Sequence, residues 1–500
     1  MPGSPRTGIK TASRTIRNVS GMEMASNTSG KMSLPALTAM VVGSMVGAGI
    51  FNLPGRFGTA TGPFGAIIAW AIAGTGMYML ARVFQALAER RPDIDSGVFA
   101  YAKAGFGDYM GFLSAFGYWL GSCLGNVFYW VLIGSTLGNF FPELFGDGSS
   151  PTAIIVSLLG IWTFHFLILR GVEQAAFVNT VVTIAKIVPI IVAIIVFIFV
   201  FNYSQFSENF FGGVGMPEKS LLAQVRDTML ITVFVFLGIE GASVYSRFAK
   251  KRSDVGAATI LGFVGVMGLM VAITLLPYAA MPRAAIAGVG NPSLAGVLEL
   301  IVGHWGAVFI SVGVLVSVLG AYLAWSLICA EVLFAAAKSK DMPSLFAAQN
   351  GNRVPANALW LTNIVVSLFV ISTYWSRDAF NFMLDMASVT SLLPYLLVAG
   401  YGILLARSGV GYEKVPDERK RDLVFAAIAA FYVIIMFLAA GLKYVLLVTV
   451  LLVPGTILYV WARREQNARL FTPAELAVFA ITLVAGLVGV AGLVTGVITP

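Results

Sequence analysis

Two apolar stretches of this 500-residue chain contain glycines where a membrane-spanning helix would need an unbroken backbone. The first is VVGSMVGAGIFNLPGR, Val41–Arg56, which has Gly43, Gly47 and Gly49 in its middle. Each glycine in a helix interior costs roughly 1 kcal/mol relative to alanine, so a continuous helix is weak here. A break at membrane depth would leave bare N–H groups at the positive end of a half-helix, and these suit an anionic group such as a carboxylate. The structural alternative is a packing seam of small residues between helices.

The second stretch is VFVFLGIEGASVYS, Val233–Ser246, in which Gly238 and Gly241 flank Glu240. It lies five predicted spans after the first. Because five is an odd number, the second half of the chain enters the membrane from the opposite side, which is the signature of an inverted repeat with a binding site where the broken helices meet. The repetition favours broken helices over a packing seam. Glu240 is expected to sense protons, to pair a cationic substrate or to satisfy backbone N–H groups at the break.

Two further charged residues lie inside predicted spans. Lys186 sits in VNTVVTIAKIVPII, and a charge at mid-membrane costs at least about 2.5–3.5 kcal/mol, so it is a candidate for coupling or gating. The alternative, a side chain that reaches the interface, is disfavoured because Pro189 and a long apolar run follow. Asp385 is expected either to pair a guanidinium or ammonium group or to act as a structural hydrogen-bond acceptor.

Other kinds of chemistry lack a pattern in the sequence. There is no GxxxxGK[ST] loop for ATP and no His, Cys and carboxylate cluster with metal spacing. Cys123 and Cys329 lie in apolar runs without a partner motif, while His165 and His304 stand alone and are expected at the membrane interface. We therefore expect no cofactor, no metal and no enzymatic activity.

Composition places the chain in a membrane. Its mean hydropathy is +0.86, with 58% hydrophobic and 11% charged residues, whereas soluble domains have roughly 25% charged residues. The long apolar runs indicate an all-α polytopic protein rather than a β-barrel. The net charge of +8 is not clustered on a soluble domain, so a nucleic-acid partner is not expected.

Apolar runs of about 20 residues predict about thirteen transmembrane helices. The boundary at 441–443 is the weakest, so twelve spans are the alternative. The predicted spans are 34–57, 63–87, 109–140, 152–170, 175–201, 221–246, 256–279, 301–337, 356–374, 380–405, 422–441, 442–463 and 474–498.

The distribution of positive charge predicts the orientation. Of the 32 lysines and arginines, 24 fall in segments on the side of the N-terminus, six fall on the other side, and Arg82 and Lys186 lie within spans. The positive-inside rule therefore predicts a multi-pass protein of the cell inner (plasma) membrane with a cytoplasmic N-terminus. Residues 1–32 form a basic, serine-rich segment, read as a disordered cytoplasmic tail, although a transit peptide has a similar composition.

Four segments are predicted from these patterns. They are the tail at 1–32, a first five-helix repeat at 33–201, a second inverted five-helix repeat at 221–405, and additional C-terminal transmembrane helices at 422–500.

Several motifs resemble one transporter superfamily. They are GSMVGAGIF in the first span, LGNVFYW (Leu124–Trp130) in the third, FLGIEGASV in the sixth, AWSLICAEVLFAAAKSKDMP (Ala324–Pro343) from the eighth into the next loop, and DSGVFAYAKAGFGDYMGFLSAFGYW (Asp95–Trp119). In these motifs the chain resembles the amino acid–polyamine–organocation (APC) superfamily, and most closely its basic amino acid/polyamine antiporter branch. The thirteenth span and DSGVFAYAKAGFGDYMGF are most similar to arginine–ornithine exchangers and their lysine-transporting relatives.

The resemblance implies a LeuT-like fold of two inverted five-helix repeats, with broken helices 1 and 6 facing each other. Backbone N–H groups in the first break would hold a substrate carboxylate, carbonyls of both breaks the α-ammonium, and aromatic and polar side chains the rest. Lys186 would brace helix 1 against helix 8 and could carry a proton. The residues implied to bind substrate are Met45, Gly47, Ala48, Gly49, Ser122, Asn126, Phe234, Leu237 and Trp325.

The resulting functional hypothesis is a secondary antiporter of cationic amino acids, arginine against ornithine, that works by alternating access. The alternative is a proton-coupled symporter of lysine or another amino acid. A channel or a ligand-sensing receptor on the same fold is a different class, and single-file conductance or binding without flux would identify it. The sequence leaves open whether the protein is a homodimer and whether protons are coupled.

Overall fold

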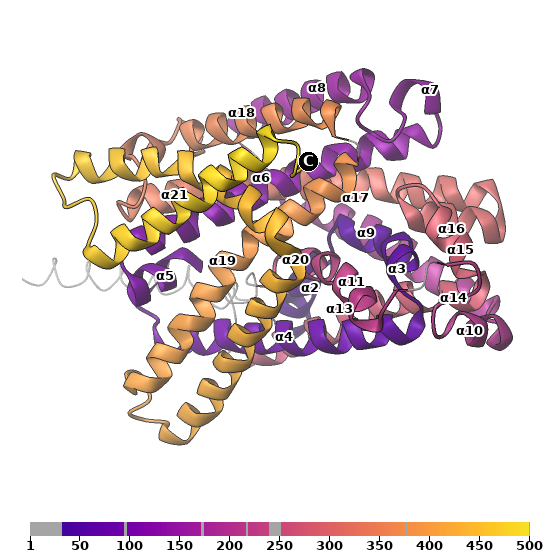
Figure 1. The fold of residues 1–500 in the computed structure, drawn as a ribbon, viewed down its shortest axis with the longest axis horizontal. Helices are drawn as coiled ribbons and strands as arrows, with labels where there is room; N and C mark the ends of the chain where they lie inside the picture. Colours follow the sequence, from indigo (N-terminus) through magenta and orange to yellow (C-terminus); the bar gives the residue numbers. More distant parts are fainter. Residues whose placement is uncertain are drawn as a thin grey trace, which may run out of the picture.

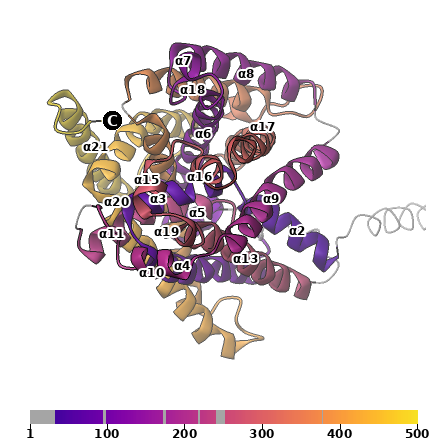
Figure 2. The same ribbon diagram turned by 90° about the vertical axis from the view of Figure 1, so that its right-hand side faces the viewer.

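The computed structural model describes residues 33–94, 98–171, 175–216, 219–239, 252–376 and 378–499. Within these ranges every regular element is a helix. Figure 1 shows most of the long helices lying roughly along one axis, with α5 (Val98–Phe106) near one end and α10 (Tyr203–Asn209) near the other. We call these the α5 end and the α10 end of the bundle. Figure 2 looks onto the α10 end, where several helices are seen nearly end-on.

Long apolar helices form the body of the bundle. They are α4 (Pro63–Arg90), α6 (Asp108–Gly138), α8 (Pro151–Leu169), α9 (Ala175–Phe199), α13 (Arg252–Leu275), α17 (His304–Lys338), α18 (Ala356–Ser372), α19 (Ala379–Ser408), α20 (Pro416–Glu465) and α21 (Pro473–Val494). Short helices connect them: α7 (Pro142–Phe145), α14 (Pro277–Ala280), α15 (Arg283–Gly288), α16 (Ser293–Val302), η3 (Ser344–Ala347) and η4 (Thr373–Trp375).

The described part of the chain has nine helices long and apolar enough to cross a membrane, or ten if α9 and α10, which are bent by 104°, are one span. The number thirteen is not confirmed by this count. The predicted span 34–57 is divided into helices too short to be counted, and of the predicted span 221–246 the structure describes only residues 221–239, whose helix is also too short. The spans predicted on either side of residue 441 are counted together as α20, although Gly441 has a non-helical conformation (φ 77°, ψ 166°) that breaks this helix.

Two interrupted helices occupy the positions predicted for spans 1 and 6. The first consists of α2 (Leu34–Met45), η1 (Ala48–Asn52) and α3 (Leu53–Ala60). The second begins with α11 (Leu221–Val235), whose Gln224 side chain accepts a hydrogen bond of 2.8 Å from Thr61 directly after α3. The first helix therefore ends where the second begins, at the α10 end, so the two run antiparallel. This is the arrangement expected of inverted repeats.

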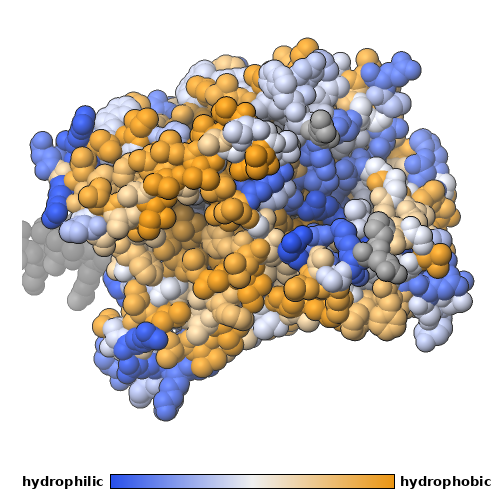
Figure 3. All heavy atoms as spheres, viewed as in Figure 1, coloured by the Kyte–Doolittle hydropathy of each residue, from blue (hydrophilic) through white to orange (hydrophobic). Residues whose placement is uncertain are grey.

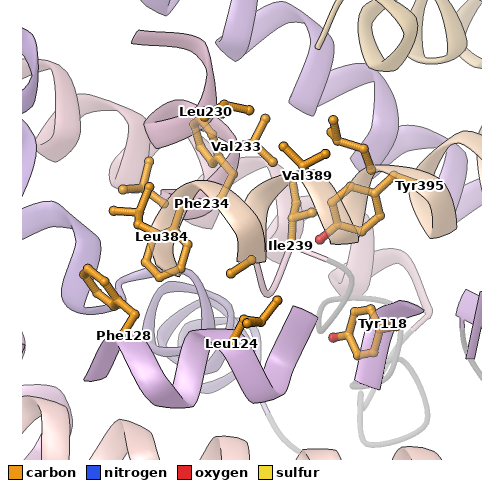
Figure 4. Packing of buried hydrophobic residues seen from close by; sticks show 14 of the residues in the cluster. Tyr118, Leu124, Phe128, Leu230, Val233, Phe234, Ile239, Leu384, Val389 and Tyr395 are labelled. Atoms are coloured by element: carbon orange, nitrogen blue, oxygen red, sulfur yellow. The ribbon is translucent and has the colours of Figure 1, made fainter. Parts of the chain in front are cut away.

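Helix α6 lies at the centre of the core, and 89% of its most apolar window is buried. It packs extensively against α19 and α17. Figure 4 shows side chains of α6, α11 and α19 meeting in this core, with Phe128, Phe234 and Leu384 side by side. On the outside, hydrophobic residues cover a broad surface between two more hydrophilic ends (Figure 3), as expected for a protein that faces lipid.

The last helix, α21, is mostly exposed and packs along α20. Thr472 and Glu475 form a capping box at its start. One Glu475 carboxylate oxygen also accepts a hydrogen bond of 2.8 Å from the backbone N–H of Tyr109. The same side chain therefore accepts hydrogen bonds from backbone N–H groups that have no partner within the helix at the beginnings of both α21 and α6.

Candidate functional site

The break in the first helix follows directly from its glycines. Helix α2 ends at Met45, and the next two residues, Val46 and Gly47, are extended. The chain then forms the 3₁₀ helix η1, whose first residues are Ala48 and Gly49. The first N–H groups of such a helix have no partner within it. By contrast, the Gly47 N–H already donates a hydrogen bond of 2.9 Å to the Met45 carbonyl.

The second helix is interrupted at the same depth. Helix α11 ends at Val235 and is followed by turns in which Gly238 has φ of +101°, a conformation that strongly favours glycine. The two breaks touch each other, because a Cβ atom added at Gly49 would lie 2.8 Å from both Phe234 and Val235. Glycine at position 49 thus permits the close approach of the two helices.

A cavity of about 30 Å³ lies between these breaks. It has room for only a few water molecules, since one water needs about 10–15 Å³ of such space, so the site must expand to admit an amino acid. Helices α6, α17 and α19 provide the remaining walls. The lining residues are Met45, Gly47, Gly49, Tyr118, Gly121, Ser122, Gly125, Tyr129, Phe234, Val235, Leu237, Trp325 and Ser391.

Two of the residues expected at the substrate are not in this lining. Ala48 is fully buried. Its side chain is a methyl group, so only its backbone could form hydrogen bonds with a substrate. Asn126 is also buried and its amide nitrogen points to Cys329 Sγ at 3.7 Å. The remaining seven expected residues, Met45, Gly47, Gly49, Ser122, Phe234, Leu237 and Trp325, all line the cavity.

Sequence reasoning missed Tyr118, Gly125 and Tyr129, which lie on α6 in a row with the predicted Ser122. Tyr118, Ser122, Gly125 and Tyr129 lie three or four positions apart and therefore share one face of the helix, and all four line the cavity. Continuing this period in both directions from Ser122 would have identified them. Ser391 on α19 gave no such signal, because only the packing of α19 against α6 brings it to the site.

Lys186 contacts the first interrupted helix. Its side chain is buried, and Nζ donates to the Gly43 carbonyl at 3.4 Å. Helix α9, which carries Lys186, packs against α17. At this contact Pro189 on α9 lies close to Gly313 on α17. The ammonium group thus links the interrupted helix to an element packed on α17. Glu240 lies outside the described residues.

Asp385 forms an ion pair across the bundle. One of its carboxylate oxygens accepts a hydrogen bond of 2.7 Å from Arg56 on α3, and the other accepts one of 3.0 Å from the Tyr444 hydroxyl on α20. The Asp385 side chain is only 9% exposed and that of Arg56 18%. Helices α3, α19 and α20 are therefore joined at one carboxylate on the α10 side of the cavity.

The walls of the site are held in place by buried hydrogen bonds. Trp119 on α6 donates to Thr362 on α18 at 2.9 Å. Tyr322 on α17 donates to Asn363, whose amide nitrogen lies 2.9 Å from His165 Nδ1 on α8. The His165 side chain is fully buried in this chain of polar contacts.

The half-helix α3 is anchored at the α10 end. The Ser293 hydroxyl at the start of α16 accepts a hydrogen bond of 2.9 Å from Gly55 N–H. Arg283 is 3% exposed and donates to the carbonyls of Gly58 at 2.7 Å, Thr59 at 3.1 Å and Gly212 at 2.7 Å. Burial lowers the pKa of Arg283 from its ordinary value.

The α5 end is closed by a network of charges. Lys103 on α5 lies 2.6 Å from Asp341 and 3.4 Å from Asp108, and Asp108 lies 2.8 Å from Arg463. Burial raises the pKa of Asp341 to about 6, although its bond with Lys103 opposes this shift. Further contacts at this end join Arg90 to Glu418, Arg91 to Tyr401, and Gln466 to the Lys340 carbonyl.

This arrangement can bind a zwitterion that carries a cationic side chain. The free N–H groups of η1 suit a carboxylate. The faces of Tyr118, Tyr129 and Trp325 suit a guanidinium or ammonium group, with a gain of roughly 0.5–2 kcal/mol per contact. Ser122 and Ser391 add hydroxyl groups. Among the described residues that line the cavity none is acidic.

Comparison with known proteins identifies relatives over nearly the whole chain. The profile of a family described as amino acid permease matches residues 32–462. An arginine/ornithine antiporter of Pseudomonas aeruginosa is 48% identical over 482 residues, which are 95% of this chain and 100% of that protein. An L-lysine transport protein of Corynebacterium glutamicum is 40% identical over 500 residues, 96% of this chain and 99% of that one. An arginine/agmatine antiporter of Chlamydia abortus is 38% identical over 455 residues, 90% of this chain and 93% of its own.

Proposed function

Because the chain belongs to the amino acid permease family, part of the APC superfamily, we propose that it exchanges arginine for ornithine across the plasma membrane by alternating access. The observation that carries the proposal is the meeting of two interrupted helices around one cavity. The identity of 48% with an arginine/ornithine antiporter over its full length supports this choice of substrates.

The substrate backbone would be bound by the protein backbone. The N–H groups of Ala48 and Gly49 would donate to the α-carboxylate, while the carbonyls of Met45, Phe234 and Leu237 would accept from the α-ammonium. Arginine and ornithine share these groups, so one site serves both substrates. The side chain would extend along α6 and α17, over the aromatic rings and hydroxyl groups of the cavity wall.

We assign the α5 end to the cytoplasm. The loops of this end carry most of the basic residues in the described part of the chain, as the positive-inside rule requires. The α10 end, with α10 and α14 to α16, then faces the outside. Transport inward begins with the separation of α3 from α19, and transport outward with the separation of α5 from the loop that follows α17.

Exchange without an external energy source requires that the loaded site reorients and the empty site does not. A ligand shifts the equilibrium between the two conformations only through contacts that differ between them. Contacts from both interrupted helices to a single substrate meet this condition, since the substrate bridges elements that must move together. Lys186 would transmit the movement of the first interrupted helix to α9 and α17.

Counterflow in proteoliposomes tests the proposal. Uptake of labelled arginine should depend on ornithine or arginine inside the vesicle, and unlabelled ornithine outside should compete. A panel of arginine, ornithine, lysine, agmatine and putrescine would rank the substrates. Equal arginine uptake into empty vesicles would contradict obligate exchange.

Proton-coupled lysine uptake is the second candidate. The 40% identity with an L-lysine transport protein and the buried ammonium of Lys186 favour it. Lysine uptake into empty vesicles that is driven by an imposed pH gradient and lost in Lys186→Ala would support this function. Lysine uptake that does not depend on the pH gradient would exclude proton-coupled transport.

A further inference from the structure

A negative charge on the route to the cavity would favour cationic over neutral amino acids. Asp385 is a buried carboxylate close to this route. It lies six residues before Ser391 on α19, which is about 9 Å along the helix. The preceding residue, Leu384, packs beside Phe234 and Phe128 at the edge of the site (Figure 4). Asp385 therefore lies between the cavity and the α10 end.

The group that Asp385 binds is a guanidinium. Arg56 Nη2 lies 2.7 Å from Oδ1, and the Tyr444 hydroxyl holds Oδ2 at 3.0 Å. We propose that Asp385 and Tyr444 form an outer cation site for the guanidinium or ammonium group of the arriving substrate, and that Arg56 occupies this site while the α10 end is closed. The inference rests on the proposed exchange of cationic amino acids.

The exchange of one guanidinium for another explains how a buried ion pair can open. Removing one partner of a buried pair is strongly unfavourable, because the remaining charge is left without compensation. When α3 moves away from α19, a substrate cation can take the place of Arg56, and the carboxylate stays paired. A neutral amino acid offers no such replacement, so the α10 end stays closed to it.

The surroundings provide a matched control. Asp378, at the start of α19, is exposed and caps that helix by accepting from Asn381 N–H at 3.1 Å. Asparagine is also a good N-cap, so Asp378→Asn removes a negative charge at the same end without loss of the cap. Lys443 lies beside the site, with its Nζ 5.2 Å from the Tyr444 ring centre.

The experiment measures the apparent KM of external arginine in right-side-out vesicles loaded with ornithine. Asp385→Asn should raise this KM by about tenfold or more, because the cation loses its carboxylate and meets an unpaired Arg56. Arg56→Gln should lower it by about threefold, because the carboxylate is free to receive substrate. Asp378→Asn should leave it unchanged, and Asp385→Glu should retain much of the affinity.

A purely structural latch gives a different pattern. Both Arg56→Gln and Asp385→Asn would break such a latch, so both would move KM in the same direction, and that result would overturn the proposal. Should Asp385→Asn not reach the membrane, the direction of the change in Arg56→Gln decides alone.

The neutral isostere citrulline separates charge from shape. Asp385→Asn should weaken inhibition by arginine and leave inhibition by citrulline unchanged, whereas equal changes for both would refute a cation site. If wild-type vesicles exchange arginine for ornithine but the variants do not show the expected changes in KM and inhibition, only the proposed outer site is wrong. If wild-type vesicles show no such exchange, the proposed function and this inference fail together.

Discussion

The two ends of the bundle are closed by different means. At the α10 end of the described chain, an ion pair between Arg56 and Asp385, whose side chains are 18% and 9% exposed, joins α3 to α19. At the α5 end Lys103, Asp108 and Arg463, with side chains 16–37% exposed, form a chain of pairs around the buried Asp341. Partly exposed pairs contribute little each and can replace one another, whereas the loss of one partner of a buried pair costs several kcal/mol.

The contact between α3 and α19 therefore depends on one ion pair among the described residues, whereas the contacts of α5 depend on several. A single pair can be exchanged for a substrate cation in one step. In a network of pairs, the loss of any one member is compensated by the others. Three substitutions test this difference.

Arg283→Met should cause the largest loss of stability. Arg283 holds three backbone carbonyls at the α10 end, and buried acceptors left without donors cost about 1–3 kcal/mol each. We expect the free energy of unfolding to fall by about 3 kcal/mol or more. The matched substitution Arg463→Met at the α5 end should cost only about 1 kcal/mol. Thermal unfolding midpoints in detergent measure both, and equal losses would remove the contrast between the ends.

Asp341 should make stability depend on pH. Its pKa is raised from 3.8 to about 6 by burial, so the folded protein binds its proton more tightly than the unfolded chain does. The stability that it contributes is complete below pH 3.8 and is lost as the pH rises through 6. The stability of the wild type relative to Asp341→Asn should therefore decrease by about 1–3 kcal/mol between pH 4 and pH 7. A difference that stays constant or increases would contradict this assignment.

Tyr444→Phe should have the smallest effect. It removes one hydrogen bond to Asp385 and leaves the pair with Arg56 in place. Such a bond contributes about 1 kcal/mol, so the KM of external arginine should change by about fivefold or less. A loss as large as that of Asp385→Asn would show that the hydroxyl, rather than the ion pair, controls the α10 end.

Local signals explain what could be predicted from the sequence. Hydropathy located the long helices within a few residues of their observed ends, because each apolar run is a property of its own segment. The glycines at 47, 49 and 238 identified the interruptions, because main-chain conformation there requires or tolerates glycine. The resemblance to transporters then selected residues from both interruptions, and most of these residues line the cavity.

Contacts between distant segments explain what could not be predicted. Arg56 and Asp385 are 329 residues apart, and nothing in either sequence context indicates the other. The resemblance to transporters implied that Asn126 binds substrate. Its amide nitrogen lies 3.7 Å from Cys329 Sγ on α17 instead. His165 looked isolated because its partner Asn363 belongs to another helix.

The central claim is that the two interrupted helices form the amino acid site together. Equilibrium binding of labelled arginine to purified Gly49→Ala and Gly47→Ala tests it most directly. A Cβ at Gly49 would lie 2.8 Å from Phe234 and Val235, whereas one at Gly47 would lie 3.9 Å from the Tyr129 hydroxyl. We expect Gly49→Ala to lose at least about tenfold in affinity and Gly47→Ala less than about threefold. Equal affinities in the two variants and the wild type would contradict the account.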